Sequence, residues 1–397
     1  MNWRKKSKKD WGRLDLNYKE TPFGKIPEHW GVGTILENSK LVTDYVANGS
    51  FASLKENVQY KNEPDYAILI RLVDFNNEFD GNFVYLSRHS YDFLKKSKLF
   101  GNEIIISNVG ANVGTVFKAP SLSKPMSLGP NSIMFIPKGD NDFYYYWMKS
   151  RFGQHMLKSI VSGSAQPKFN KTDFRRLEIP VPPINEQKEI GSILRSLDDR
   201  IAENKKINHQ LEQIAKAIFY EKFGNQVPNG LLGDLASVSS GKRPPIKVSE
   251  RTATEDIPIL GAASIMGYTS KSLYSEKILV TGRVGTHGII QRYNRPCWPS
   301  DNALVLKSDD YELVYQNLLS IDFSSMNRGS TQPLITQTDL KNVAIYIPTQ
   351  IELSDFEDTV GTIMQQYESN IVANESLVQL RDSLLPKLMS GEISVTD

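Results

Sequence analysis

Two glycine-rich loops contain the side chains best suited to reading a nucleic acid. They read SNVGANVG and TGRVGTHG, at 107–114 and 281–288, each directly after an apolar run. The polar side chains that stand out in them are Asn108, Asn112, Arg283 and His287. Glycine allows close backbone approach, while Asn, Arg and His present the donors and acceptors that base edges require. A tight strand-to-strand turn explains the glycines equally well. For Arg283 and His287 we favour contact with bases.

A second polar group follows a Gly-Ser-x-Gln-Pro segment that the chain contains twice. Amide and ammonium side chains there suit contacts with bases or phosphates, whereas the Thr-Asp pairs at 172–173 and 338–339 are better interpreted as turn caps. Polar residues beside other glycine or proline loop signals are weaker candidates. The full candidate set for DNA contact is Ser107, Asn108, Asn112, Asn131, Gln166, Lys168, Asn170, Lys171, Lys242, Arg243, Arg283, His287, Asn302, Arg328 and Gln332.

Motifs for catalysis are missing from the sequence. Its five histidines show no HExxH or paired spacing, and neither a P-loop nor the Asp/Asn-Pro-Pro-aromatic tetrapeptide of amino-methyltransferases occurs. No carboxylate cluster with a following Asp/Glu-x-Lys indicates a nuclease. The single cysteine, Cys297, excludes an internal disulfide framework and a cysteine-based zinc site, and a packed thiol is its simplest interpretation. We therefore predict a reader without catalytic residues, metal or cofactor.

The elements that position these loops come in two copies. GSAQPKFNKTDFRRLEIPVP at 163–182 is matched by GSTQPLITQTDLKNVAIYIP at 329–348, a constant offset of 166 residues. Such a period is too long for a solenoid repeat and right for a whole domain. A chain of 397 residues with 40% hydrophobic residues can bury two ordinary cores. The sequence therefore predicts a tandem pair of domains.

Short apolar runs bounded by Gly, Asn and Pro predict strands in both halves. In the first half they are 66–73, 103–106, 133–136 and 177–181, and in the second they are 278–280, 303–306 and 343–347. Aromatic and apolar spacing predicts one helix over 142–161, with Gly153 as a weak point, and another over 311–319. The aromatic cluster Tyr144 to Trp147 could stack on bases, but core packing is the interpretation we favour.

A long helix ends each half. Apolar residues in alternating steps of four and three predict a coiled-coil seam, and Gly224 ends the first helix. The seam residues are Ile190, Leu194, Leu197, Ile201, Asn204, Leu211, Ile218, Val360, Met364, Tyr367, Ile371, Asn374 and Leu385. Asn204 aligns with Asn374, either within the seam, where Asn fixes register, or on its exposed edge. Equivalent halves related by a pseudo-twofold axis favour antiparallel packing of the two helices. At 1.5 Å per residue, the first helix, from 190 to 223, spans on the order of 50 Å. Helices of this length would hold the two domains well apart, so the expected DNA target is bipartite.

Overall charge neither supports nor excludes nucleic-acid binding, because 47 basic and 45 acidic residues leave a net charge of +2. The basic run RKKSKK at 4–9 is best interpreted as a solvated tail, with a phosphate-contacting arm as the alternative. No apolar stretch has the ~18 residues of a membrane span, and the N-terminus lacks the apolar run of a signal peptide. We expect a soluble, cytoplasmic protein without a membrane partner.

Taken in order, several motifs give the chain a clear family resemblance. Gly24 to Trp30 (GKIPEHW), Leu232 to Ala236 (LGDLA), both Gly-Ser-x-Gln-Pro segments, Pro182 to Ile190 (PPINEQKEI) and Leu380 to Leu388 (LRDSLLPKL) resemble the specificity subunit of type I restriction-modification enzymes. The first half departs from the pattern in lacking a clear Leu-Gly-Asp, and the second long helix begins without Pro-Pro and Glu-Gln.

The resemblance implies an α+β protein of two pseudo-twofold repeats, each a mixed α/β target recognition domain followed by a long helix, the two helices packing as an antiparallel coiled coil. It implies these divisions: a basic segment 1–20, recognition domains 21–183 and 225–349, and spacer helices 184–224 and 350–397. Expected partners are double-stranded DNA, two methyltransferase (M) subunits that carry S-adenosylmethionine, and motor-nuclease (R) subunits that use ATP. A bivalent protein scaffold that does not read DNA, and less plausibly a stand-alone methyltransferase or nuclease, are the alternatives.

Overall fold

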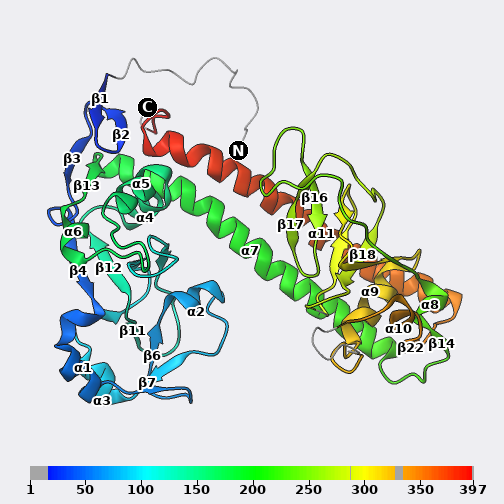
Figure 1. Cartoon of the computed structure of the whole chain (residues 1–397). Coiled ribbons are helices and arrows are strands. Elements are labelled where there is room, and N and C mark those ends of the chain that lie inside the picture. The colour runs from blue at the N-terminus through cyan, green and yellow to red at the C-terminus, as the bar shows by residue number, and fades with distance from the viewer. Residues whose placement is uncertain (1–16, 287, 327–333, 396–397) are drawn as a thin grey trace, which may run out of the picture. The chain divides into compact units, whose positions relative to one another are not determined.

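The computed structural model describes residues 17–286, 288–326 and 334–395 (Figure 1). The chain folds as two compact units, Met1–Ala202 with Glu375–Asp397 (unit 1) and Glu203–Asn374 (unit 2). Each unit contains one mixed α/β domain together with a part of both long helices. The unit boundary therefore falls within the helices and not at their ends.

The centre of unit 1 is a four-stranded antiparallel sheet in the order β10-β9-β12-β4. Its strands are β4 (Ser39–Asp44), β9 (Ile104–Ser107), β10 (Val116–Lys118) and β12 (Ser132–Pro137). Side chains alternate between the faces of a strand. Along β9, Ile104 and Ile106 enter a core shared with helices, whereas Ile105 enters a core shared with a second sheet. Both faces of this sheet are buried.

The second sheet of unit 1 has five strands in the order β5-β7-β6-β11-β8. They are β5 (Tyr60–Lys61), β6 (Ala67–Ile70), β7 (Val84–Leu86), β8 (Lys98–Leu99) and β11 (Met126–Leu128). The sequence predicted a strand over 66–73, but the strand ends at Ile70. Asp74 accepts hydrogen bonds from the Arg71 backbone (2.7 Å) and guanidinium, and this pair starts a helix there. Short elements around the sheet are η1 (Tyr45–Asn48), α1 (Phe51–Asn57), α2 (Leu72–Asn76) and α3 (Arg88–Phe93).

The helix predicted over 142–161 is two helices, α4 (Asn141–Lys149) and α5 (Arg151–Ser159). Helix α4 ends and α5 begins at Ser150, whose hydroxyl accepts a hydrogen bond from Gly153 N. Gly153 has no room for a side chain, since a Cβ would lie 2.2 Å from the Trp147 carbonyl oxygen. Tyr144, Tyr146 and Trp147 are at most 3% exposed, in agreement with the core interpretation of the aromatic cluster.

The remaining elements of unit 1 connect the first and last segments of its mixed α/β domain. Strands β1 (Tyr18–Thr21) and β2 (Gly24–Pro27) form a hairpin, and β3 (Gly31–Thr34) pairs with β13 (Glu178–Val181). Helix α6 (Lys171–Arg176) lies between the first Gly-Ser-x-Gln-Pro segment and β13. This pairing places the beginning of the domain beside its last strand, directly before the long helix.

Unit 2 repeats the central sheet in the equivalent order, β15-β21-β18-β19, again antiparallel. The strands are β15 (Ser237–Ser240), β18 (Ile278–Gly282), β19 (Gln291–Tyr293) and β21 (Ala303–Lys307). A three-stranded sheet holds β16 (Ile257–Leu260), β17 (Ile265–Thr269) and β20 (Trp298–Pro299). The other elements are β14 (Gly230–Leu231), α8 (Leu232–Leu235), α9 (Tyr311–Ser320), α10 (Gln337–Lys341) and β22 (Ala344–Ile345).

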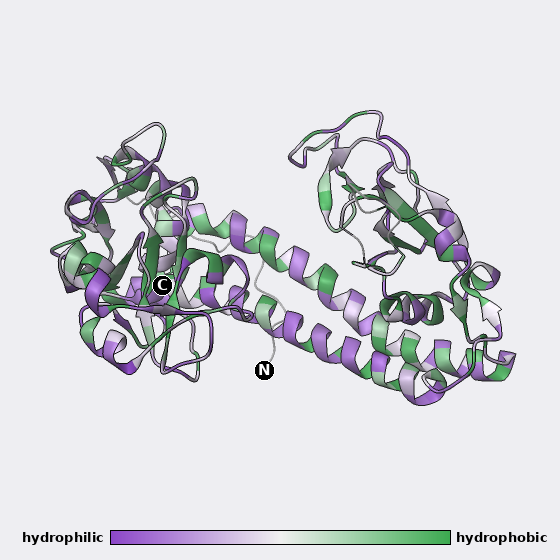
Figure 2. Ribbon diagram, turned by 60° about the horizontal axis from the view of Figure 1, so that its bottom comes forward, coloured by the Kyte–Doolittle hydropathy of each residue, from purple (hydrophilic) through white to green (hydrophobic). Residues whose placement is uncertain are grey.

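Two helices of 40 residues each, α7 (Ile184–Phe223) and α11 (Gln350–Met389), follow the two domains. Helix α7 ends where Gly224 was predicted to end it. In unit 1 Arg381 donates to Asp198 (2.7 Å), and in unit 2 Asn204 donates to Asn374 (2.8 Å), so the helices pack antiparallel. Hydrophobic and hydrophilic residues alternate along both (Figure 2), as expected for helices buried on one side. The predicted α+β class, with two repeats and an antiparallel helix pair, is confirmed.

No described helix is both long enough and apolar enough to cross a membrane.

Candidate nucleic-acid interface

Three segments far apart in sequence meet at one end of the central sheet of unit 1. Asn108 N donates to the Asn131 carbonyl (3.0 Å), and Phe169 N donates to the Asn108 carbonyl (3.1 Å). A bridge between Val109 and Lys168 extends the contact. The glycine-rich loop after β9, the turn before β12 and the Gly-Ser-x-Gln-Pro segment are thereby joined; we call them the loop end of unit 1.

Unit 2 contains the same arrangement with different side chains. Arg283 N donates to the Asn302 carbonyl (2.8 Å), and Ile335 N donates to the Arg283 carbonyl (3.0 Å). Val284 and Leu334 form the bridge that Val109 and Lys168 form in unit 1. Arg283 thus takes the place of Asn108. The loop after β18, the turn before β21 and the segment before α10 form the loop end of unit 2.

Most candidate side chains at the loop ends are accessible. The exposed ones are Asn112, Asn131, Gln166, Lys168 and Asn170 in unit 1 and Asn302 in unit 2, and the candidates Lys242 and Arg243, which follow β15, are exposed as well. Arg283 is half-buried, and within the described residues its guanidinium has no hydrogen-bond or ion-pair partner. Gly110 and Gly114 have φ of +97° and +91°, and Asn131 has φ of +65°, so the turn explanation for glycine and Asn at these positions also applies.

Four candidates are buried or have partners within the protein, although one of them, Asn170, is exposed. Ser107 is 1% exposed, so its hydroxyl does not reach a ligand in this conformation. The Asn108 amide donates to the Phe169 carbonyl (3.0 Å). Asn170 caps α6, because its side chain accepts from Asp173 N (2.9 Å), and Lys171 forms an ion pair with Asp44 (2.8 Å). Their residue types suited a polar contact, but the partners are internal.

Three further candidates, His287, Arg328 and Gln332, lie outside the described residues, as does the Gly-Ser-x-Gln-Pro sequence of the second half.

Each loop end is carried on a domain that is clamped to a long helix by a similar contact. In unit 1, buried Gln187 on α7 accepts from Asp140 N (2.9 Å) at the start of α4. In unit 2, Glu357 on α11 accepts from Glu312 N (3.2 Å) and Leu313 N (2.8 Å) at the start of α9. Burial raises the pKa of Glu357 to about 7, against the effect of these two donors and with a contribution from the charge of Glu312. Sequence reasoning missed this role for both residues.

Two motifs that carried the family resemblance form a single contact. Glu186, in PPINEQKEI, accepts from the indole of Trp30 (2.8 Å) and is paired with His29 (2.8 Å), both in GKIPEHW. The structure therefore explains why the two motifs occur together: one fixes the start of the domain against the start of its helix.

Unit 2 has a buried charge network that the sequence did not reveal. The Arg292 guanidinium donates to both Glu312 oxygens (2.6 and 2.8 Å) and to Glu368 on α11 (2.9 Å). It also lies over the rings of Tyr311 and Tyr315. Burial opposes its charge, but Glu312 and Glu368 raise the pKa of Arg292 above its ordinary value. This network ties β19, α9 and α11 together.

The predicted helix seam is buried to different depths. Ile190, Leu194, Val360 and Met364 are at most 1% exposed. The half-buried members are Leu197, Ile201, Leu211, Ile218, Tyr367, Ile371, Asn374 and Leu385. Asn204 is 2% exposed, so it lies within the seam and not on its edge. A second pair, in which Asn370 donates to Asn208 (2.8 Å), was missed because Asn370 falls outside the four-three stepping.

The described residues contain no group of three or more His, Cys, Asp or Glu arranged to hold a metal ion. Burial raises the pKa of the Cys297 thiol to about 12, so this thiol stays protonated and is a poor nucleophile near neutral pH. The chemistry available at the loop ends is hydrogen bonding and charge.

Comparison with known proteins agrees with this description. The family model for the type I restriction modification DNA specificity domain matches residues 42–213 and again 229–378. The type I restriction enzyme MjaIX specificity subunit of Methanocaldococcus jannaschii is 25% identical, with 97% of this chain and 98% of that protein covered. The HindI specificity subunit of Haemophilus influenzae is 21% identical over 68% of this chain and 80% of its own length.

Among solved structures, the S subunit of a type I restriction-modification system from M. genitalium has a similar fold. Its TM-score is 0.55 at 18% identity, with 93% of this chain and 98% of that chain covered. The two family-model matches include most of the chain and coincide with the two repeats. The chain belongs to the type I restriction modification DNA specificity domain family.

Proposed function

We propose that this chain is the sequence-reading subunit of a type I restriction-modification complex, and that each loop end reads one part of a split, asymmetric DNA target. The observation that carries the proposal is the loop end itself. The same backbone hydrogen bonds recur in both units, while Asn108 in one is replaced by Arg283 in the other. An identical frame with different polar groups is what two domains need in order to read different bases.

The division of the chain follows from this proposal. The two recognition domains are 21–183 and 225–349, and the helices 184–224 and 350–397 act as the spacer between them. The proposed contact set comprises the exposed polar residues of the loop ends together with Lys242, Arg243, Arg283, His287, Arg328 and Gln332. A non-specific DNA stretch would separate the two parts of the target.

The chemistry belongs to partners in this proposal. We expect two methyltransferase subunits, carrying S-adenosylmethionine, to methylate adenine within the target, and motor-nuclease subunits using ATP to complete the restriction complex. The chain itself would be non-catalytic, acting in the cytoplasm as reader and scaffold.

Mapping of methylated adenines tests the proposal directly. A host genome is sequenced for N6-methyladenine with and without this chain, and the complex is then tested for binding to the mapped sequence in excess competitor DNA. We expect one split motif that disappears when the chain is absent. Methylation that persists without the chain, or binding with no preference for the motif, would exclude sequence reading and leave a protein scaffold.

A further inference from the structure

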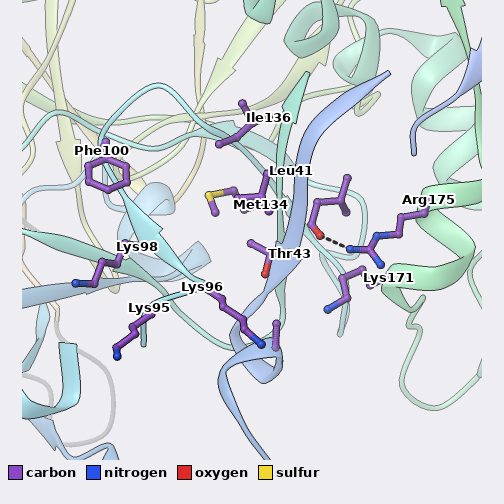
Figure 3. Close-up of a pocket in the computed structure, with 12 residues that line it drawn as sticks. Leu41, Thr43, Lys95, Lys96, Lys98, Phe100, Met134, Ile136, Lys171 and Arg175 are labelled. Atoms are coloured by element: carbon purple, nitrogen blue, oxygen red, sulfur yellow. Dashed lines mark hydrogen bonds between the residues drawn. The ribbon is translucent and has the colours of Figure 1, made fainter. Parts of the chain in front are cut away.

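Unit 1 contains a basic pocket outside its loop end. The pocket has a volume of about 430 Å³ and lies between β4 and β12 on one side and the segment around β8 on the other (Figure 3). Five cationic side chains line it, and no Asp or Glu does: Lys95, Lys96, Lys98, Lys171 and Arg175. A concave surface with this charge favours an anionic ligand.

The cations of the pocket are only partly neutralised. Lys171 pairs with Asp44 (2.8 Å), and Lys98 pairs with Asp92 (3.5 Å). Five cations against two carboxylates leave a surplus of three positive charges. Lys95 and Lys96 are exposed, with no side-chain partner among the described residues.

Arg175 is held in place while keeping a donor unused. Its Nη2 donates to the Val42 carbonyl (2.6 Å), the bond drawn in Figure 3. Its buried Nε has no hydrogen-bond partner. A buried donor left without an acceptor is unfavourable, and an anion in the pocket is a natural acceptor for such a group.

Apolar groups beside the cations indicate a sugar-phosphate and not a free phosphate ion. Leu41, Met134 and Ile136 line the same pocket, and Phe100 projects beside it with 81% of its surface exposed. The turn that presents Phe100 is fixed by buried Glu103, which accepts from Phe100 N (2.8 Å) and Gly101 N (2.9 Å). Along a nucleic-acid backbone each phosphate is followed by a deoxyribose, whose carbon face suits an apolar surface.

The pocket is continuous with the loop end through Lys171. This residue lines the pocket and binds Asp44, the last residue of β4, whose partner in the sheet is Ile133, two residues beyond Asn131. In unit 2 the aligned residue is Gln337, which is hydrogen-bonded to the Ser240 hydroxyl (2.9 Å) and carries no charge. The geometry points to a phosphate-binding site for the DNA backbone that flanks the bases read by unit 1, an inference that rests on the proposed function.

The double variant Lys95→Ala/Lys96→Ala tests this inference, because both side chains are exposed and can be removed without disturbing the fold. The full chain, assembled with its methyltransferase partner, is titrated with target duplex at several salt concentrations. If two phosphate contacts are lost, the slope of log K against log salt becomes shallower by about 1.8. Affinity should fall roughly 10-fold at low salt, while the preference for target over non-target DNA stays unchanged.

Lys149→Ala/Lys158→Ala is the matched control, since it removes the same charge from α4 and α5, the helices on the other face of the sheet. A slope that changes equally in both double variants, or in neither, overturns the inference. The proposed function fails separately, if the unaltered complex shows no target preference.

Methylphosphonate duplexes identify the source of the phosphate. Uncharged linkages placed one at a time in the flank on the unit 1 side should weaken binding to the unaltered chain several-fold at one or two positions. The same positions should have no further effect on the Lys95→Ala/Lys96→Ala variant. Binding of inorganic phosphate that depends on these lysines, together with no methylphosphonate effect, would reassign the pocket to a small anion and overturn the DNA inference.

Discussion

At the residue scale, equivalent positions of the two units hold different side chains within one backbone frame. The Asn108 side-chain amide donates a hydrogen bond to the Phe169 carbonyl. At the same position of unit 2, the Arg283 guanidinium has no partner among the described residues. An arginine free to approach base edges can bind guanine with two hydrogen bonds. The equivalent position therefore has a structural role in unit 1 and is open for recognition in unit 2.

Arg283→Ala should alter the reading of only one part of the target. Discrimination at one base pair should fall by about 1–3 kcal/mol, because a two-pronged contact is lost. Asn112→Ala, an exposed residue of the other loop end, should affect the other part of the target instead. Binding of both variants to duplexes randomised in each part provides the measurement. Equal loss of preference in both parts would contradict the assignment of one loop end to each.

Glu357 should make the stability of unit 2 depend on pH. Its pKa is raised by burial from 4.5 to about 7. The folded state therefore holds a proton that the unfolded state has released, and this contribution to stability is complete below about pH 4.5 and lost as the pH rises through about 7. Glu357→Gln removes the charge and keeps an acceptor oxygen for one of the two backbone donors, and the loss of the other hydrogen bond does not vary with pH.

Thermal unfolding between pH 5 and 8 measures the effect. The melting temperature of Glu357→Gln relative to the unaltered chain should increase as the pH rises, because only the unaltered chain buries a charge at pH 8. Gln187→Glu, the reciprocal change in unit 1, should introduce such a dependence there. A difference between Glu357→Gln and the unaltered chain that stays constant with pH would show that the carboxyl is ionised throughout.

At the scale of elements, matching positions of the two long helices meet different surroundings. Gly191 and Gly361 occupy the same place in the aligned IGSIL and VGTIM segments. A Cβ at Gly191 would lie 2.5 Å from Asp140 Oδ1 and 2.9 Å from Phe143 N, where α7 packs against the start of α4. A Cβ at Gly361 would meet nothing within 4 Å.

Alanine at these two positions should therefore have opposite effects on stability. Gly191→Ala should destabilise the chain by about 1–3 kcal/mol through overpacking. Gly361→Ala should stabilise it by about 0.5–1 kcal/mol, because glycine is unfavourable within a helix. Urea unfolding of the full chain, followed by circular dichroism, measures both. Similar changes for the two variants would show that the close approach of α7 and α4 is not what requires glycine at 191.

At the scale of the whole molecule, the proposed spacer is a helix pair whose register is marked by polar contacts. The Asp198–Arg381 pair and the Asn204–Asn374 pair bracket a short stretch of both helices. Buried asparagine pairs cost stability but favour one register over its alternatives. If the helices set the distance between the parts of the target, their length in this stretch should set the tolerated spacer.

Deletion of residues 199–202 together with 376–379 should shorten the preferred DNA spacer. Four residues correspond to about 6 Å of helix, or roughly two base pairs. Methylation mapping in cells that express the shortened chain provides the measurement. Deleting 199–202 alone should abolish methylation, because it puts the Asp198–Arg381 pair and the asparagine pairs out of register with each other. An unchanged spacer with the double deletion would mean that the helices do not measure the target.

Patterns in the sequence were sufficient to predict the repeat, the fold class, the long helices and the end of α7 at Gly224. These features follow from the spacing of apolar residues and from the residues that end each element, and both can be seen without the tertiary structure. The sequence also aligned Asn204 with Asn374, but only the structure shows that the two side chains meet within the seam. The tertiary structure alone decided which polar residues remain available: Ser107 is buried, Asn170 caps α6, and Lys171 faces Asp44. It also brought Lys96 and Lys171 to one pocket and Glu357 to the start of α9. Such partners come from distant segments, and only the pairing of strands and the packing of helices determines which of them meet.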